Sequence, residues 1–322
     1  LDHYVAHRVS GIPKGLPKPS PPPISVVNLS YTYMGNAALD IICSVIAMEG
    51  SPLKTIDISF CGIEERGCLA LAKAFAKRKR NGILPLRGII LSGNHISYRA
   101  ATELGRALSP DQHSKETRKS KPARRVSAGG YAEDSESDDD DEDDEVFGAS
   151  NAPSSQKAPS TNSRGSEKYY SKDYGLQVLH LGSTLDGAES VAQLLHGLGH
   201  LCPVKELSLT SNNIGSEGVD MIVNFLEGKK LPKKQQVMPY LDRLDLSNNK
   251  LGNDGLTKLT RAIAKRTVSH FVELRLTNNG IGHVGVETMM NKLLQHNLVS
   301  LTLDRNNIGD QGCQLVAASL QS

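Results

Sequence analysis

The chain has 322 residues, no Trp and only 4% aromatic residues, so a folded core must consist mainly of Leu, Ile, Val and Ala. It has no apolar run of about 18 residues or more, which excludes a transmembrane helix, and it shows no signal-peptide pattern at its start. A start at Leu1 instead of Met, and an end inside a helical pattern, are typical of a fragment. The formal net charge of +2 is close to neutral, but the charges are unevenly distributed along the chain.

The first segment, residues 1–23, is rich in proline and predicts an extended leader. Pro19-Ser20-Pro21-Pro22 within it forms a P-x-x-P pattern. Aromatic grooves of partner proteins recognise such a pattern as a polyproline II helix. The leader is therefore interpreted either as a passive extension or as a docking segment.

From residue 24 onward, one pattern recurs eight times: L-x-x-L-x-L-x-x-N-x-L/I-G-x-x-G, followed by apolar residues at helical spacing. Most copies lie 27 to 37 residues apart, a period typical of a stacked repeat. The copies open at Ile24, Leu53, Leu86, Leu176, Val204, Leu241, Phe271 and Leu298.

Each copy predicts one strand followed by one helix. In the sixth copy, Leu244 and Leu246 alternate with polar residues as in a half-buried strand. Leu256, Leu259 and Ile263 follow at helical spacing. A single strand and helix cannot bury their apolar faces, whereas stacked neighbours can. The sequence therefore predicts an α/β solenoid shaped as a horseshoe arc, with a parallel sheet on the concave side and helices on the convex side.

A buried polar residue is expected where each strand ends. There the chain turns inward and leaves backbone N–H and C=O groups without strand partners, and a carboxamide bonds both kinds. The Asn residues at this position are Asn94, Asn212, Asn249, Asn279 and Asn306. The remaining copies carry Thr32, Cys61 and Thr184.

The motif N-x-I/L-G-x-x-G is complete in the last four copies and looser in the first four. The complete motifs span 212–218, 249–255, 279–285 and 306–312. They resemble the ribonuclease-inhibitor-type leucine-rich repeat family, over residues 24–108 (repeats 1–3) and 174–322 (repeats 4–8). The resemblance implies a leucine-rich repeat fold. It implies no single function, because the family includes inhibitors, ligand domains of innate sensors, activators of the Ran GTPase, and ciliary and cytoskeletal scaffolds.

Residues 109–173 separate the third copy from the fourth and have few large apolar side chains, which predicts a disordered acidic insert. Within it, Glu133–Glu145 holds eleven acids in thirteen residues. Ser127 follows two arginines and resembles a basophilic kinase site, whereas Ser135 and Ser137 precede acids and resemble acidophilic sites. The alternative is a solvated, self-repelling tether.

Outside this insert the chain carries 27 bases and 20 acids, so the predicted solenoid is basic. The irregular repeats add basic residues between a helix and the next strand, and such additions map to one edge of a solenoid. This predicted basic edge contains Lys77, Arg78, Lys79, Arg80, Lys229, Lys230, Lys233 and Lys234. The cations either complement helix dipoles or bind a polyanion such as nucleic acid, acidic lipid or an acidic protein tail. In a variant of the second hypothesis, the acidic tract folds back on the basic edge and screens it, reversibly by phosphorylation.

Residues beside the buried strand leucines are expected on the concave face. In the N-terminal copies they are more apolar and aromatic, which resembles a protein-binding hot spot; alternatively they pack under the leader. In the C-terminal copies they carry both charges, which alternatively pair with each other. The candidate protein-binding residues are Tyr31, Tyr33, Asp57, Phe60, Ile90, His95, Arg243, Asp245, Glu273, Arg275 and Arg305.

No catalytic, cofactor or metal site is expected. The sequence has no Walker A motif, dinucleotide fingerprint, H-E-x-x-H motif or nucleophile elbow, and no Cys/His cluster at ligand spacing. Its five Cys form no C-x-x-C pair and are expected as core thiols in a reducing compartment. We therefore expect an intracellular, cytoplasmic protein, with a cytoskeletal or ciliary setting as one option and a nuclear location less favoured.

These observations favour a non-catalytic protein–protein interaction scaffold in a larger cytoskeletal, ciliary or signalling assembly, with protein partners, no small-molecule substrate and no membrane span. One alternative is a GTPase-activating protein resembling the Ran activator, although in that family the acidic tract follows the last repeat. Another is a polyanion binder that uses the basic edge. The sequence does not identify the partner.

Overall fold

A computed structural model describes residues 24–109, 175–199, 202–227, 240–265, 271–293 and 298–321. The Pro-rich leader and residues 110–173 of the predicted insert lie outside these ranges. Ser127, Ser135 and Ser137 lie outside them as well, so these predictions and the disorder of the insert stay predictions.

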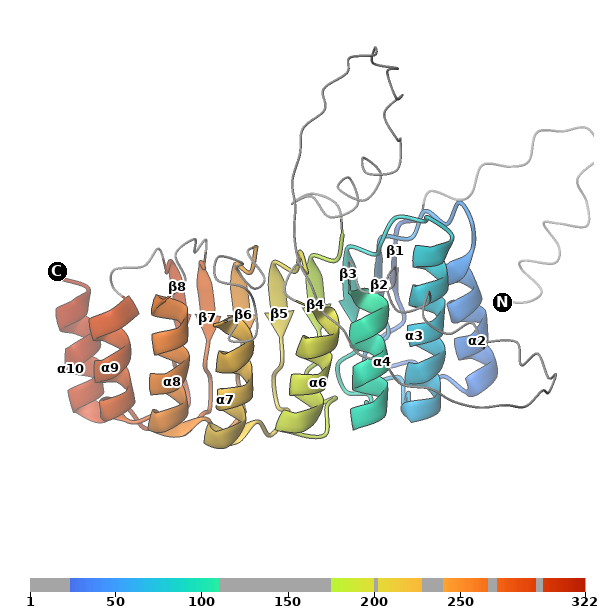
Figure 1. Cartoon of the computed structure of the whole chain (residues 1–322). Helices are drawn as coiled ribbons and strands as arrows, with labels where there is room; N and C mark the ends of the chain where they lie inside the picture. The colour runs from blue at the N-terminus through green and yellow to red at the C-terminus, as the bar shows by residue number, and fades with distance from the viewer. Residues whose placement is uncertain are drawn as a thin grey trace, which may run out of the picture.

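Strands and helices alternate along the described chain (Figure 1). The strands are β1 (Val26–Asn28), β2 (Thr55–Asp57), β3 (Gly88–Ile90), β4 (Val178–His180), β5 (Glu206–Ser208), β6 (Arg243–Asp245), β7 (Glu273–Arg275) and β8 (Ser300–Thr302). The helices are α2 (Asn36–Ala47), α3 (Glu65–Arg80), α4 (Tyr98–Leu108), α6 (Ala188–Leu198), α7 (Gly215–Leu226), α8 (Gly252–Ala264), α9 (His283–Leu293) and α10 (Gly309–Ser319).

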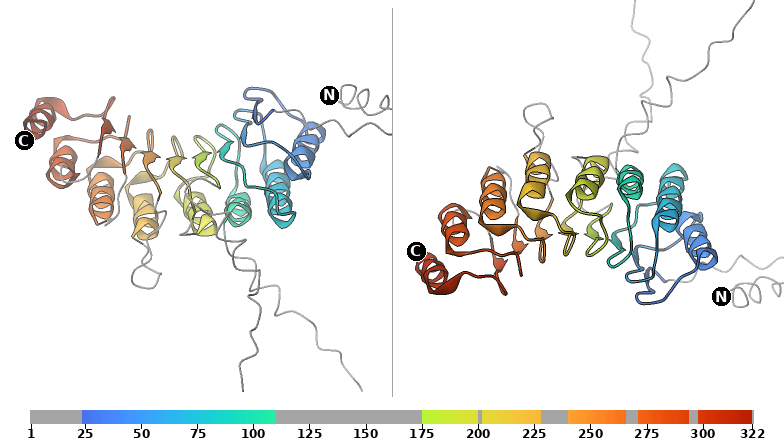
Figure 2. Two further views of the ribbon diagram at one scale, coloured as in Figure 1. Left: turned by 90° about the horizontal axis from the view of Figure 1, so that it is seen from above. Right: turned by 90° about the horizontal axis from the view of Figure 1, so that it is seen from below.

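All of these strands form one parallel sheet whose spatial order equals the chain order. Equivalent residues of consecutive repeats are in register, so that Leu207, Leu244 and Leu274 lie side by side. The strands line the inner side of a shallow arc and the helices its outer side (Figure 2). The predicted leucine-rich repeat solenoid is therefore confirmed.

One continuous core lies between the sheet and the helices. Leu244 of β6 and Leu246 just after it are buried, whereas Asp245 between them is only half buried, as the period of two requires. Leu256 and Leu259 of α8 cover this part of the sheet and are completely buried. No helix in the described ranges has both the length and the hydrophobicity needed to span a membrane.

The long insert leaves the stacking of its flanking repeats intact. β3 pairs directly with β4, with Ile89 opposite Leu179. The helices α4 and α6 meet at Gly105 and Gly197, where a Cβ on Gly197 would lie 2.8 Å from the Gly105 Cα. Only residues without a side chain allow this approach. The insert therefore interrupts the sequence of the solenoid without separating its third and fourth repeats.

The predicted asparagines form a ladder inside the turns that follow the strands. The Asn249 Oδ1 accepts from the backbone N–H of Asn212 at 2.9 Å, and its Nδ2 donates to the Leu209, Leu246 and Ser247 carbonyls. The Asn249 N–H in turn donates to the Asn279 Oδ1 at 3.0 Å. Each carboxamide thus ties its own repeat to the preceding one.

This ladder is weaker where Asn is replaced. The Cys61 thiol donates to the carbonyls of Leu29 and Ser59, and the Thr184 hydroxyl donates to the Gly182 carbonyl at 2.6 Å. The thiol is a weak donor and acceptor, and the hydroxyl has one donor hydrogen on one oxygen, whereas a carboxamide has two donor hydrogens and a separate acceptor oxygen. Thr32 is exposed, so the first repeat lacks a buried group at this position.

Asn249→Ala should lower the free energy of unfolding by about 3 kcal/mol, because buried carbonyls and N–H groups lose their partners and each orphan costs about 1–3 kcal/mol. Urea unfolding followed by circular dichroism measures this loss. The control is Asn307→Ala, at an exposed position beside the last ladder residue. Equal losses in the two variants would show that the ladder contributes nothing special.

Candidate protein-binding surfaces

The residue before the ladder position has a left-handed backbone in every repeat. Its φ lies between 51° and 71° throughout. The residues are Tyr31, Phe60, Gly93, Ser183, Ser211, Asn248, Asn278 and Arg305. We did not predict this shared feature, although the Gly, Ser and Asn at this position in five repeats are a signal for it.

The sheet ladder itself requires this conformation. The N–H of Tyr31 donates to the Ser59 carbonyl at 2.8 Å, and the N–H of Phe60 donates to the Ser92 carbonyl at 2.7 Å. The same bond recurs in the C-terminal half, from the Ser211 N–H to the Ser247 carbonyl at 2.9 Å. The main-chain ladder therefore continues beyond each three-residue strand, and the side chains at these positions lie along the edge of the concave face.

Aromatic side chains occupy this position in the first two repeats. Their rings are stacked, with centroids 4.7 Å apart and an interplanar angle of 5°, because parallel neighbours of a sheet lie at about that distance. The Phe60 ring then rests on Gly93, where any Cβ would overlap it. The Tyr33 ring lies over Gly62 in the same way: a Cβ on Gly62 would be 2.9 Å from the ring. Tyr31, Tyr33 and Phe60 form what we call the aromatic ridge.

The aromatic ridge is exposed, and two of its three residues, Tyr31 and Phe60, have a left-handed backbone. Tyr31, Tyr33 and Phe60 have exposed fractions of 76%, 86% and 45%. A left-handed backbone costs a residue other than Gly or Asn about 1–2 kcal/mol. Tyr31 and Phe60 thus occupy positions that the other repeats mostly fill with Gly, Ser or Asn. The same left-handed backbone recurs at Ser183, Ser211 and Arg305, so the conformation belongs to the repeat and the large exposed rings are what is particular to the first two repeats.

The structure corrects where these side chains lie. We predicted Tyr31, Tyr33 and Phe60 on the strands, but β1 ends at Asn28 and β2 ends at Asp57. All three follow the strands, because each strand has only three residues before its chain turns into the loop.

The other N-terminal candidates have different surroundings. Asp57 is half buried and accepts from the N–H of Ser59 at 3.0 Å. Ile90 is half buried on β3, whereas His95 is exposed with its Nδ1 3.4 Å from the Asp186 carboxylate. Asp57 and Ile90 are in register on neighbouring strands and extend the surface from the aromatic ridge onto the concave face.

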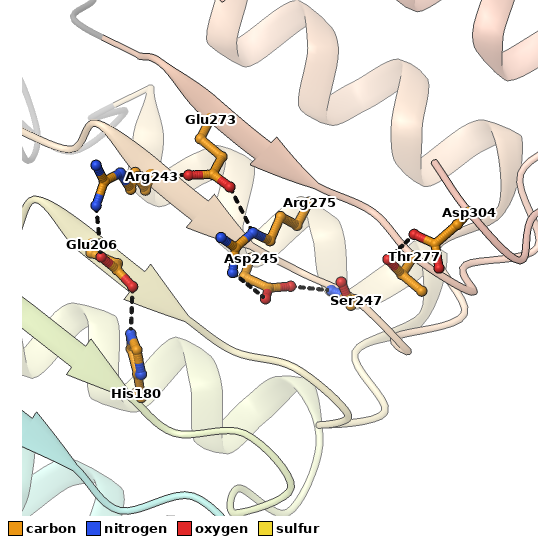
Figure 3. A network of polar contacts seen from close by, with 9 residues as sticks. All are labelled: His180, Glu206, Arg243, Asp245, Ser247, Glu273, Arg275, Thr277 and Asp304. Carbon is orange, nitrogen blue, oxygen red and sulfur yellow. Dashed lines mark hydrogen bonds and ion pairs between the residues drawn. The ribbon is translucent and has the colours of Figure 1, made fainter. Parts of the chain in front are cut away.

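The C-terminal candidates form a network of opposite charges across β4 to β7 (Figure 3). Glu206 accepts from the His180 Nε2 at 2.8 Å and lies 3.2 Å from the Arg243 guanidinium. Arg243 also lies 3.5 Å from Glu273, which accepts from the Arg275 Nε at 2.7 Å. These charges satisfy each other, as one of our two interpretations expected.

The network lines a shallow pocket of about 210 Å³ on the concave face. Asp245 lies 3.9 Å from Arg275 and accepts from the Ser247 N–H, so the strand-face carboxylates have donors in place. Arg305 is exposed beyond this network, at the left-handed position of the last repeat.

Glu206 has a lowered pKa. Burial alone would raise it, but hydrogen bonds from His180 and Arg243 and the charges of both side chains outweigh burial. A carboxylate held in its ionised form is poorly suited to take up a proton near neutral pH.

The structure also corrects the predicted basic edge. Lys77–Arg80 form the last turn of α3 rather than an addition after it. Arg78 is buried and donates to the carbonyls of Ile46, Leu53 and Leu84 at 2.7–2.9 Å, so it is a structural clamp and no part of a binding edge. Lys79 donates to the Ser109 carbonyl at 2.6 Å.

Lys77 and Arg80 remain exposed at this edge. Its other predicted members, Lys229, Lys230, Lys233 and Lys234, lie outside the described residues. The basic edge is therefore smaller, within the described ranges, than its sequence implied.

The cysteines are free thiols. Burial raises the pKa of Cys68 and of Cys202 to about 12, which makes both unreactive at neutral pH. In the described part of the chain, no group of three His, Cys, Asp or Glu side chains is placed to hold a metal ion.

Comparisons with known proteins agree with this geometry. A family profile described as "Leucine Rich repeat" matches residues 51–72, 200–223, 237–259, 269–290 and 295–317. The ribonuclease inhibitor of Sus scrofa is 24% identical over 332 aligned positions, which cover 93% of this chain and 68% of that protein. The chain thus folds as a leucine-rich repeat solenoid and is similar in sequence to a ribonuclease inhibitor. Its first, third and fourth leucine-rich repeats lie outside the profile matches, yet each folds as a strand and a helix.

Glu206→Gln should remove the pH dependence that the lowered pKa causes. Ionised Glu206 stabilises the fold above its ordinary pKa of 4.5, and this contribution is lost as the pH falls through the lower folded pKa. The free energy of unfolding of the wild type should thus exceed that of the variant by up to about 1 kcal/mol at pH 7, and the difference should shrink as the pH falls below 4.5.

Urea unfolding at several pH values measures this difference. Glu217→Gln, an exposed position on α7, serves as the matched control and should show a smaller change. A constant gap between wild type and Glu206→Gln from pH 7 to 3 would refute the argument.

Proposed function

We propose that this leucine-rich repeat protein is a non-catalytic scaffold that binds a protein partner through the aromatic ridge and the adjoining concave face. The fold supports a binding role, because a stacked solenoid presents a long surface instead of an enclosed pocket. The Sus scrofa relative is named for inhibiting ribonuclease, and we extend to this chain only its mode of action, which is binding to another protein. We further propose an intracellular setting, in a cytoskeletal, ciliary or signalling assembly.

One observation carries this proposal: Tyr31 and Phe60 keep large aromatic rings, exposed and stacked, at left-handed positions. Folding alone favours Gly or Asn there. Aromatic side chains with few rotatable bonds are the residues that contribute most to protein interfaces. We infer that the ridge is retained for a partner that covers it.

The aromatic ridge favours this function over the two alternatives. Two observations argue against a GTPase-activating protein: the strand-face acids lie among arginines, and we match no residue of this chain to a catalytic residue of that family. For a polyanion binder, the predicted basic edge loses Arg78 to the core, and Lys79 is engaged by Ser109. We expect no stimulation of GTP hydrolysis when the full chain is added to a Ran-type GTPase; a rise in turnover would favour the enzymatic alternative.

Phe60→Asn and Tyr31→Ser replace the rings by residues that other repeats carry at the same position. We expect the affinity for the partner to fall about tenfold or more. The free energy of unfolding should stay within about 1 kcal/mol of the wild type, because relief of backbone strain offsets the lost ring contact. The partner is first identified by capture with the full chain from cell extract, and affinities are then measured calorimetrically with the purified partner.

The matched control is Ser211→Asn, at the equivalent left-handed position of the fifth repeat. It should change neither affinity nor stability. If Phe60→Asn instead lowers stability by several kcal/mol, the rings are structural and pack against another part of the chain. Unchanged affinity in both ridge variants would refute the proposal.

A further inference from the structure

The convex side carries a groove between α2 and α3 with an open volume of about 890 Å³. Its floor is formed by small or apolar side chains of both helices, among them Cys43, Ala47, Leu69 and Ala74. Lys73, Lys77 and Arg80 of α3 lie at spacings of four and three, so they form one row along the groove. Asp40, Glu65 and Arg66 line its other end, which is mixed in charge.

At the equivalent place between α7 and α8, two ion pairs join the neighbouring repeats. The Lys258 Nζ lies 2.7 Å from the Asp220 carboxylate, and the Lys265 Nζ lies 2.7 Å from the Glu227 carboxylate. Each pair joins one helix to the next, so these cations are already matched within the chain.

The repeat register relates the two grooves residue by residue. Lys265 follows its ladder residue Asn249 by sixteen positions, and Lys77 follows Cys61 by the same number. Glu227 follows Asn212 by fifteen positions, and its counterpart in α2 is Ala47. Ala47 and Lys77 both line the groove between α2 and α3, as this correspondence requires. The lysine is thus present in both grooves, but the carboxylate that pairs with it is missing from the first.

The two described acids that line this groove, Asp40 and Glu65, form no ion pair with the basic row. Lys73, Lys77 and Arg80 are exposed, and none makes an ion pair or a hydrogen bond with a described side chain. Helix-dipole complementation explains cations in the last turn of α3, but Lys73 lies before that turn. Nor does the dipole explain why an apolar floor lies beside them.

We propose that this groove binds an amphipathic helix of a partner protein, with apolar residues against the floor and acidic residues against Lys73, Lys77 and Arg80. A partner carboxylate would take the place that Glu227 holds in the groove between α7 and α8. An apolar helix face in a groove is a common mode of peptide recognition, and the groove extends along much of the 16-residue helix α3. The site lies on the helix side of the arc, so its test is independent of the test of the aromatic ridge.

The test measures binding of the full chain to a fluorescent synthetic helix by anisotropy. The probe has about 16 residues, Leu and Ala on one face, and Glu clustered at one end. A second probe carries Lys in place of Glu. We expect the acidic probe to bind in a salt-dependent manner and the basic probe to bind at least tenfold more weakly.

Ala47→Glu is the decisive variant, because it supplies within the chain the carboxylate that Lys77 lacks. We expect it to weaken binding of the acidic probe about tenfold; because Ala47 is buried, urea unfolding of the variant is measured beside it to show that the fold is retained. Lys73→Glu combined with Lys77→Glu should weaken the probe further. Lys292→Glu, an exposed lysine in the last turn of α9, is the matched control and should leave binding unchanged.

Each other outcome overturns the proposal. Equal binding of both probes, or an unchanged affinity in Ala47→Glu, would remove the role of the basic row. If the acidic probe binds only after the acids of Glu133–Glu145 are replaced by their amides, the occupant is a segment of this chain and no partner helix. If duplex DNA or phosphatidylserine vesicles respond to the variants and the acidic helix does not, the row is a polyanion site.

Discussion

The architecture depends on a main-chain ladder that continues past each strand into the turn. The strands have only three residues each, too few to define a sheet by themselves. The ladder is prolonged by a left-handed residue whose N–H bonds to the neighbouring repeat, as from Ser211 to Ser247. The carboxamide of the next residue, Asn212, then satisfies the groups that the inward turn exposes. Stacking is thus specified in the turns more than in the strands.

This ladder also determines which side chains lie next to each other on the concave surface. Equivalent residues of neighbouring repeats lie about 4.8 Å apart, so side chains form rows across the repeats. Two aromatic residues in consecutive repeats must stack, as Tyr31 and Phe60 do. Glu206, Arg243 and Glu273 alternate in sign along another row and therefore pair. The same spacing yields an exposed apolar ridge at one end of the arc and a self-satisfied charge network toward the other.

The sequence predicted the fold and the ladder asparagines, because each depends on a pattern that repeats. It did not predict the left-handed position, since Tyr31 and Phe60 break the Gly, Ser and Asn preference that reveals it. It also misplaced Arg78 on the surface. The three carbonyls that bind its guanidinium belong to loops and a helix end that meet only after the repeats stack. Irregular residues of a repeat protein thus have to be located in three dimensions.

The loss of one side chain has different consequences on the sheet side and on the helix side of the solenoid. On the sheet side a row tolerates gaps, because Gly93 simply supports the ring of Phe60. On the helix side the axes of neighbouring helices lie about 8–10 Å apart, and on the exposed surface an ion pair such as Lys265 with Glu227 joins one residue of each repeat. The loss of one member, as at Ala47, leaves the other without a partner. An unmatched cation such as Lys77 is therefore more informative about a missing ligand than any gap in a concave row.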